Sequence, residues 1–113
     1  MLKSVIHKNK EQCYICNRYG VLHPHHIFNG SYKKKSEEDG MIIWVHDFPC
    51  HRSIHDDYSK GIELKVMAQE VWEKTYGDRE KFIKRYGMSY IDRKEQNDKN
   101  NTNRWYWKIP KNT

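Results

Sequence analysis

The second half of the chain has the hydrophobic spacing of two helices. Over residues 64–75 the apolar positions recur at intervals of three and four, which predicts a helix with one buried face that ends at Gly77. Asp78 is a suitable N-cap for a second helix, and Gly87 is a suitable stop at its C-terminus. We interpret both helices as core. Their apolar faces comprise Leu64, Met67, Ala68, Val71, Trp72 and Thr75 in the first helix, and Phe82, Ile83 and Tyr86 in the second.

The first half of the chain has the pattern of strands and turns. Residues 13–20 predict a knuckle turn, and residues 21–28 predict a short strand that their proline confines to an edge or a bend. Residues 41–46, rich in β-branched and aromatic side chains, predict a second strand. Residues 29–40 between them are polar and begin and end in Asn-Gly and Asp-Gly, so we expect a loop. Residues 50–60 then predict a short helix, which gives an α+β fold ordered strand, strand, helix.

The length and composition indicate one small domain with a polar tail. The chain has 113 residues, of which 36% are hydrophobic and 32% charged, so part of it is expected to be solvated rather than packed. We place the folded domain at residues 1–91 and the tail at residues 92–113. The aromatic residues near the end of the tail pack on the body or stack on nucleic-acid bases, and packing is the more common role. They are Trp105, Tyr106 and Trp107.

The charge and the absence of long apolar runs narrow the class of partner. Lysine and arginine number 21 against 15 acidic residues, a formal net charge of +6, which suits a polyanionic partner. No apolar run reaches the length of a membrane span, and the first residues lack a secretory apolar stretch. We therefore expect a soluble cytoplasmic protein that has no membrane partner. No pattern for an organic cofactor is present, and none is expected.

The cysteines predict a structural zinc site. Cys13 and Cys16 have the two-residue spacing of a metal-binding turn, and Cys50 supplies a third thiol. Structural zinc usually takes four tetrahedral Cys or His ligands. The nearest candidates for the fourth are His46 and Asp47, and we choose His46 because imidazole is the more common structural ligand. The alternative is that the CxxC pair is a chance occurrence or a redox pair.

A second group of histidines predicts a separate metal site. His51 and His55 are four residues apart, so on a helix their imidazoles share one face and can bind one ion. His25 and His26 lie on the first predicted strand, where successive side chains point to opposite sides. One of them can therefore bind a metal while the other faces a substrate. His23 is more simply a supporting or exposed residue.

This arrangement resembles the ββα-metal motif of HNH nucleases, the His-Me finger superfamily. A strand with a His-His pair and a second strand leading to a helix with His-x3-His are the features that carry the resemblance. By similarity to the DNase colicins, it implies that His25, His51 and His55 are ligands of a catalytic ion and that His26 is the general base. The asparagine of the HNH motif is missing, and the resemblance implies that Asp39 or Ser36 takes its role of bracing the loop.

Residues 13–91 are also similar to a phage-associated family of HNH-like proteins, the recombination-enhancement or RecA-dependent nucleases. The similar segments are CxxC, then HHI, a basic loop, a strand, a Cys-His pair and the later FIKRYG. Membership would imply a phage or mobile-element protein that acts on single-stranded or branched DNA together with a recombinase filament. Its location would then be the host cell cytoplasm.

Hydrolysis of a phosphodiester needs a nucleophilic water and stabilisation of the charge that develops on the phosphate. An imidazole can accept a proton near neutral pH, as His26 would do. A site of three histidines binds Zn²⁺ or Ni²⁺ better than Mg²⁺, so the working ion is left open among Mg²⁺, Mn²⁺, Ni²⁺ and Zn²⁺. The candidate phosphate-binding residues are Lys33, Lys34 and Lys35 in the expected loop, with Arg52 and Arg104.

Three functions follow from these features. The first is a metal-dependent DNA endonuclease or nickase. The second is a zinc-stabilised nucleic-acid-binding module that retains the fold without cleavage, and the missing asparagine supports it, whereas His26 argues for the nuclease. The third is a protein-interaction zinc knuckle, in which the lysine run is only a solvated loop.

Overall fold

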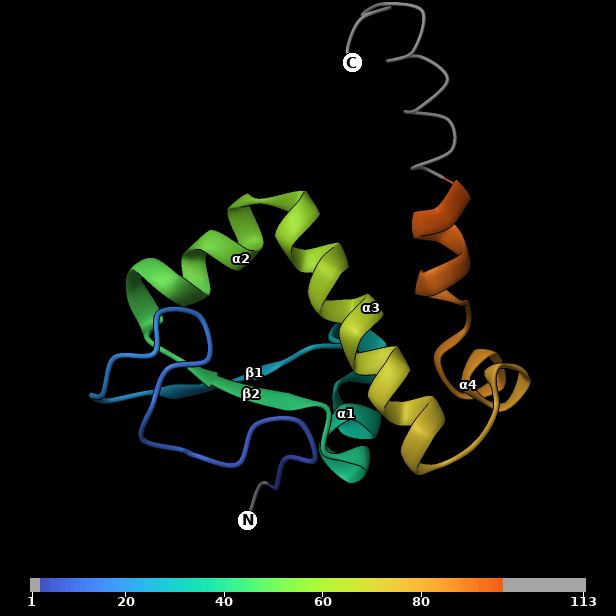
Figure 1. The fold of residues 1–113 in the computed structure, drawn as a ribbon, viewed down its shortest axis with the longest axis horizontal. Coiled ribbons are helices and arrows are strands. Elements are labelled where there is room, and N and C mark those ends of the chain that lie inside the picture. Colours follow the sequence, from blue (N-terminus) through green and yellow to red (C-terminus); the bar gives the residue numbers. More distant parts are fainter. Residues whose placement is uncertain (1–2, 97–113) are drawn as a thin grey trace, which may run out of the picture.

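The computed structural model describes residues 3–96, which form a small α+β fold around a two-stranded antiparallel sheet (Figure 1). Residues 90–96 are also helical. Within the described part, no helix is both long and apolar enough to cross a membrane. In chain order the elements are β1 (His23–His26), the 3-10 turn η1 (Gly30–Tyr32), α1 (Lys33–Asp39), β2 (Ile42–Val45), the wide turn η2 (Asp47–His51), α2 (Arg52–Asp56), α3 (Tyr58–Thr75) and α4 (Arg79–Tyr86).

The two strands lie within the predicted ranges and pair with each other, with His25 opposite Ile43. All four residues of β2 are buried, because the N-terminal segment (blue in Figure 1) runs beside its free edge. The backbone N–H of Tyr14 donates to the Trp44 carbonyl at 2.9 Å, and the Trp44 N–H donates to Nδ1 of His7 at 3.0 Å. The strand therefore needs the segment that carries the first two cysteines to satisfy its backbone.

The prediction of a loop between the two strands is wrong, because residues 30–39 are helical. Helix α1 ends at Gly40, which adopts the left-handed conformation with φ of 74°. The helix was not apparent from hydrophobic spacing because the residues that it buries, Ser36 and Asp39, are polar. A helix with no apolar face has the composition of a loop, and here hydrogen bonds to the buried side chains replace apolar packing.

Ser36 joins α1 to the end of the first strand. Its hydroxyl donates to the Phe28 carbonyl at 2.6 Å and accepts from the Phe28 N–H at 3.1 Å, and it is fully buried. Of the two residues expected to brace the loop, Ser36 is therefore the one that holds it to β1. Phe28 lies two residues after His26, so this hydroxyl also fixes the backbone next to the strand that carries the histidine pair.

Ser36→Ala should lower the free energy of unfolding by about 1–3 kcal/mol, because it leaves two buried backbone groups without partners. Ser31→Ala is the matched control, since Ser31 is exposed on the preceding turn. Urea denaturation of both variants measures the difference. Equal midpoints for the two variants would show that Ser36 braces nothing.

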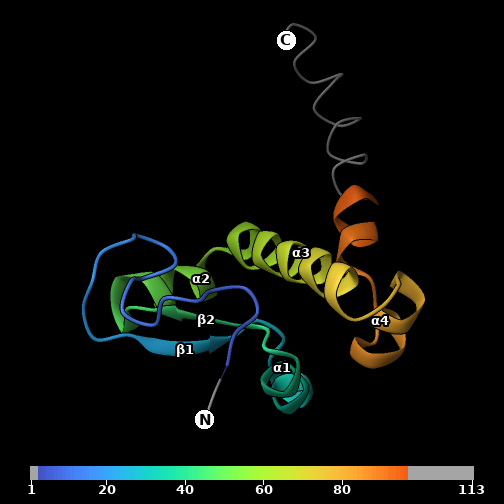
Figure 2. The ribbon, with the colours of Figure 1, turned by 60° about the horizontal axis from the view of Figure 1, so that its bottom comes forward.

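Asp39 ties α1 to the two later helices. Its carboxylate accepts hydrogen bonds from Trp72 Nε1 at 2.8 Å, from the Tyr86 hydroxyl at 2.7 Å and from Arg85 Nε at 2.6 Å. These bonds explain why α1 and α4 both lie beside the C-terminal half of α3 (Figures 1 and 2). Asp39 thus has a structural role in the packing of the helices, distinct from the loop brace.

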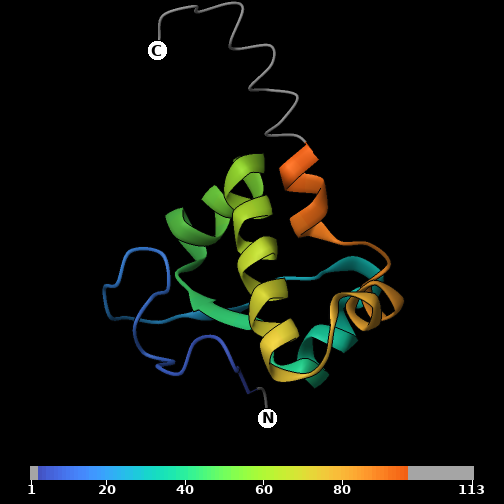
Figure 3. The same ribbon diagram turned by 45° about the vertical axis from the view of Figure 1, so that its right-hand side comes forward.

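The short helix expected over residues 50–60 is divided. Helix α2 ends at Asp56, Asp57 is extended, and α3 starts at Tyr58, six residues before the predicted apolar face begins. The break occurs because the Asp57 side chain caps α3, accepting from the Lys60 N–H at 3.3 Å. Figure 3 shows α3 leaving α2 at this point and crossing the molecule toward α4.

The apolar faces of the two long helices are largely as predicted. In α3 the buried residues include Leu64, Ala68 and Trp72, whereas Thr75 is exposed. In α4 the Asp78 cap and the left-handed Gly87 stop are confirmed. Ile83, expected on the apolar side of α4, is 38% exposed. Helix α4 is short and contacts α3 along a narrow stripe, so only Phe82 and Tyr86 are buried.

The helical residues 90–96 continue past the expected domain end at residue 91. Arg79 at the start of α4 pairs with Asp92 at 2.9 Å, which connects this segment to the body. The remaining tail residues lie outside the described residues. They include Arg104, Trp105, Tyr106 and Trp107, so the structure does not bear on the roles proposed for them.

Candidate metal centres

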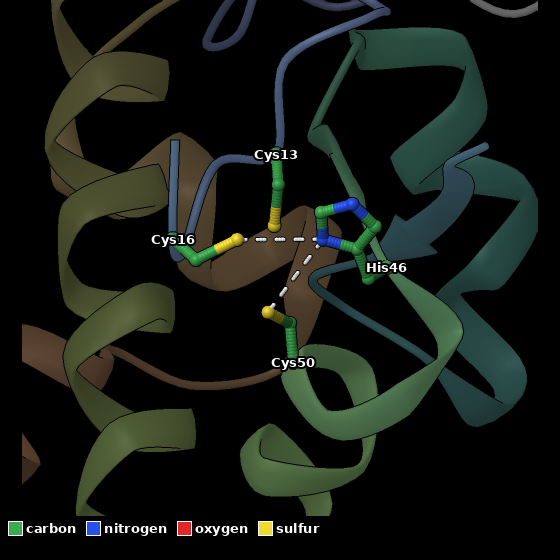
Figure 4. A group of neighbouring side chains, drawn as sticks. All are labelled: Cys13, Cys16, His46 and Cys50. Atoms are coloured by element: carbon green, nitrogen blue, oxygen red, sulfur yellow. Dashed lines mark hydrogen bonds between the residues drawn. The ribbon is translucent and has the colours of Figure 1, made fainter. Parts of the chain in front are cut away.

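The first group of candidate ligands converges at one end of the sheet. Cys13 and Cys16 come from the N-terminal segment, while His46 and Cys50 come from the turn that follows β2, and all four side chains point toward one another (Figure 4). Their ligand atoms all lie within 4.8 Å of one another. The structure therefore contains a Cys3His cluster that could bind a metal ion.

Local backbone geometry explains how the N-terminal segment presents its thiols. The turn closes through a bond from the Asn17 N–H to the Cys13 carbonyl at 2.9 Å, and Asn17 takes the left-handed conformation that this turn needs. Gly20 follows, also at positive φ, and a Cβ there would come within 3.0 Å of His46 Nε2. A glycine at this position lets the imidazole approach the thiols.

The distances within this cluster suit a tetrahedral zinc ion. Nδ1 of His46 is 3.4 Å from Cys16 Sγ and 3.9 Å from Cys50 Sγ. Zinc bonds of 2.0–2.3 Å in a tetrahedron place neighbouring ligand atoms roughly 3.5 Å apart. A nitrogen and two sulfurs at these separations can therefore share one ion without rearrangement of the backbone.

The acidities of the thiols also favour a cation at this position. Burial opposes ionisation of Cys13, but hydrogen bonds from the backbone N–H groups of Cys16 and His46 outweigh it and lower the pKa of Cys13 to about 6. Burial, together with the neighbouring sulfurs, raises the pKa of Cys50 to about 12. A hydrogen bond from the backbone N–H of Arg18 also lowers the pKa of Cys16, so Cys50 is the thiol whose ionisation its neighbours oppose, and a metal cation would allow all three to ionise.

The structure also separates the two candidates for the fourth ligand. His46 lies in the cluster, whereas Asp47 lies outside it with its side chain 78% exposed. Asp47 instead approaches the second site, where its carboxylate is 3.8 Å from Nδ1 of His51. A carboxylate behind a histidine is a common means of orienting a metal-binding imidazole.

The second cluster brings together His25 of β1 with His51 and His55. His51 closes η2 and His55 lies on α2, so the four-residue spacing holds although the helix begins only at Arg52. The Nε2 atoms of His51 and His55 are 3.2 Å apart, and the His25 ring is 5.1 Å and 5.6 Å from theirs between centroids. Three imidazole nitrogens thus face one point, as binding of one ion requires.

Burial favours the neutral, metal-binding form of two of these histidines. Burial, then the proximity of His51 and His55, lowers the pKa of His25 to about 4. Burial also lowers the pKa of His51, with His55 adding to the effect. His25 in particular is neutral at pH 7, so its lone pair is available and no proton has to be displaced by an incoming cation.

His26, the next residue on β1, does not belong to this cluster. Its Nε2 lies 2.7 Å from a carboxylate oxygen of Glu37 on α1. If Nε2 carries the proton in that contact, Nδ1 is left as the unprotonated nitrogen that can accept one. Glu37 was not identified from the sequence, because its contact with His26 depends on the unexpected helix α1.

The candidate phosphate-binding cations lie in different environments. Lys33 and Lys34 are exposed in the first turn of α1. Lys35 is partly buried and its Nζ donates to the Arg85 carbonyl at 2.9 Å, so it has a packing role. Arg52 is exposed and lies 3.4 Å from Asp56 on the same helix. Only the first two lysines present an unobstructed charge to solvent.

Comparisons of the chain with family models, with curated proteins and with solved structures gave no match. The function is therefore inferred from the geometry of the two clusters and from the sequence pattern that they contain.

Proposed function

We propose that the protein is a metal-dependent endonuclease of the HNH type that hydrolyses phosphodiester bonds in DNA. The observation that carries the proposal is the pairing of a three-histidine cluster with a further histidine beside it on the same strand. The cluster suits an ion, and the adjacent His26, held by a carboxylate, suits a general base. A structural zinc site has no use for such a base, so its presence favours an enzyme over a binding module.

The two clusters would have different tasks. In the Cys3His cluster every ligand position is taken by the protein, which is the arrangement of a structural zinc ion. The cluster of His25, His51 and His55 supplies three ligands, which leaves coordination positions for water and substrate. A divalent cation bound there would act as a Lewis acid toward the phosphate and its leaving oxygen.

The chain's own groups account for the proton transfer. His26 would take a proton from the attacking water while Glu37 keeps its imidazole in one tautomer and orientation. Lys33 and Lys34 extend from the start of α1, the helix that also carries Glu37, and would attract the DNA backbone. The proposal also includes a phage or mobile-element origin and a recombinase partner. These two points are supported only by the resemblance of the sequence to the phage-associated family.

The proposal is tested by nicking of supercoiled plasmid and of single-stranded circles. The full chain is treated with a chelator, and Mg²⁺, Mn²⁺, Ni²⁺ or Zn²⁺ is then added back in separate reactions. We expect cleavage to stop on chelation and to return with at least one of these ions. Salt-sensitive binding of DNA without cleavage under any condition would favour the zinc-stabilised binding module instead.

Glu37→Gln should reduce kcat about tenfold or more, because a neutral amide no longer favours the tautomer in which Nδ1 of His26 accepts a proton. KM and the melting temperature should change little, since Glu37 is exposed. Glu38→Gln is the control: Glu38 is the next residue on α1 and pairs with Arg85 instead. If both variants lose activity equally, the contact between Glu37 and His26 has no role in cleavage.

A further inference from the structure

Two hollows flank the histidine cluster. The first, here the Lys65 hollow, has a volume of about 170 Å³ and is lined by His25 and His55 together with Tyr58 and Lys65. The second, here the Phe48 hollow, adjoins His51 and His55 on the side of η2, where Phe48 forms part of its wall. His55 lines both. A chain-like ligand that passes over the cluster would therefore contact both hollows.

The Lys65 hollow is suited to an anion. Lys65 is half-buried, and burial lowers the pKa of its ammonium group. Among residues 3–96 no carboxylate forms an ion pair with Lys65, and none lines the hollow. Its Nζ lies over the ring of Tyr90, 5.5 Å from the ring centroid. A partly desolvated cation without an anionic partner, next to a metal cluster, is what a phosphate site requires.

The Phe48 hollow, in contrast, is not suited to an anion. Its only cation among the described residues is Arg52, and two carboxylates, Asp47 and Asp56, share its lining. Asp56 lies 3.4 Å from the guanidinium, so little positive charge is left for a phosphate. Phe48 is 74% exposed, an unusual degree for a phenyl ring that no described aromatic side chain covers. The hollow therefore suits the flat, uncharged face of a base.

Tyr58 provides a second aromatic surface at the first hollow. It is 66% exposed at the start of α3, in the same lining as Lys65. An aromatic ring and a cation in one hollow match the base and the phosphate of a single nucleotide. Each hollow thus offers an aromatic face, and only the first also offers an unpaired positive charge.

We propose that one strand of nucleic acid crosses the histidine cluster between these hollows, with a phosphate bound by Lys65 and an unpaired base stacked on Phe48. This inference rests on the proposed nuclease function and adds the class of substrate. In a duplex, each base is covered on both faces by its neighbours, so a ring such as Phe48 cannot stack on it without unstacking. The enzyme should therefore prefer single-stranded or locally unpaired nucleic acid at the position next to the scissile phosphate.

The proposed binding of a phosphate by Lys65 is tested with labelled single-stranded oligonucleotides. The full-length protein carries His26→Ala so that the strand is not cut. Lys65→Gln should weaken binding several-fold and reduce the slope of log affinity against log salt by about 0.7, the value for one phosphate of a single strand. Lys74→Gln, on the exposed last turn of the same helix, should leave the slope unchanged. Lys65→Arg should restore it. Equal slopes for the Lys65→Gln and Lys74→Gln proteins would overturn the phosphate site.

The base site is tested by comparing single-stranded and duplex oligonucleotides of the same sequence. Phe48→Ala should weaken binding of the single strand about fivefold or more and change duplex binding much less, since stacking on an aromatic ring contributes about 1–3 kcal/mol per base. Tyr19→Ala is the control, because Tyr19 is also an exposed aromatic residue, at 66%, but lines neither hollow. Equal loss for both strand forms, or no loss, would overturn the inference while leaving nuclease activity intact. Failure of the unsubstituted protein to bind or cut any nucleic acid would instead remove the proposed function.

Discussion

Replacing His26 with alanine is expected to slow cleavage about 10²–10⁴-fold, the contribution typical of a general base. The imidazole follows His25 on β1 without belonging to the histidine cluster, and its Nε2 is already occupied by Glu37 at 2.7 Å. Metal binding should survive, because the three clustered histidines are untouched. Single-turnover cleavage of plasmid, with metal content measured on the same samples, checks both expectations.

The contact with Glu37 makes a sharper test possible. If His26 acts through that contact, Glu37→Gln should slow the wild-type protein but have no further effect once His26 is alanine. His23→Ala is the matched control, since His23 lies on the same strand and is exposed outside both clusters. A His23→Ala protein as slow as His26→Ala would indicate that disturbance of the strand, not loss of the base, explains the result.

Replacing Cys13 with serine is expected to release the ion of the Cys3His cluster and to unfold much of the domain. Cys13 is fully buried within the core, and the cluster joins the N-terminal segment to the turn after β2. The loss should be about 5 kcal/mol or more of unfolding free energy, which is comparable with the whole stability of a small domain. Zinc content and thermal unfolding, with and without chelator, measure the change.

Asp47→Asn is the control for this experiment. Asp47 was the other candidate for the fourth zinc ligand, and in the structure it lies outside the cluster. Its substitution should therefore leave the melting temperature, and the zinc that stays bound under mild chelation, close to the wild-type values. Loss of zinc from this variant, together with retention of zinc in His46→Ala, would contradict the ligand set drawn from the structure.

The sequence predicted best those features that depend on local spacing. CxxC and His-x3-His place their side chains together within one turn, so these two pairs could be identified before any fold was known, whereas His25 was chosen as a ligand from the resemblance to HNH nucleases. The strand carrying His25 and the long helix α3 were predictable from alternation and from helical periodicity. The capping residue Asp78 was predictable from its position before an apolar run.

The features that were missed depend on contacts between distant residues. Helix α1 buries Ser36 and Asp39 through hydrogen bonds, so its sequence has no apolar stripe that would identify it. Glu37 meets His26 across 11 residues only because that helix forms. Lys65 lies on a helix that sequence analysis assigned wholly to the core, and its position beside the histidines depends on how α3 leaves α2.

The structural ion and the catalytic ion can be told apart by counting the metal ions on the full chain while the cleavage rate is measured as chelator is increased. We expect two ions with separate roles. One stays bound under mild chelation and maintains the fold, and the other is lost first, stops cleavage when it leaves and restores cleavage when it is returned. Undiminished cleavage by protein that retains only the first ion, or cleavage lost only when the protein unfolds, would contradict a catalytic site at the histidine cluster.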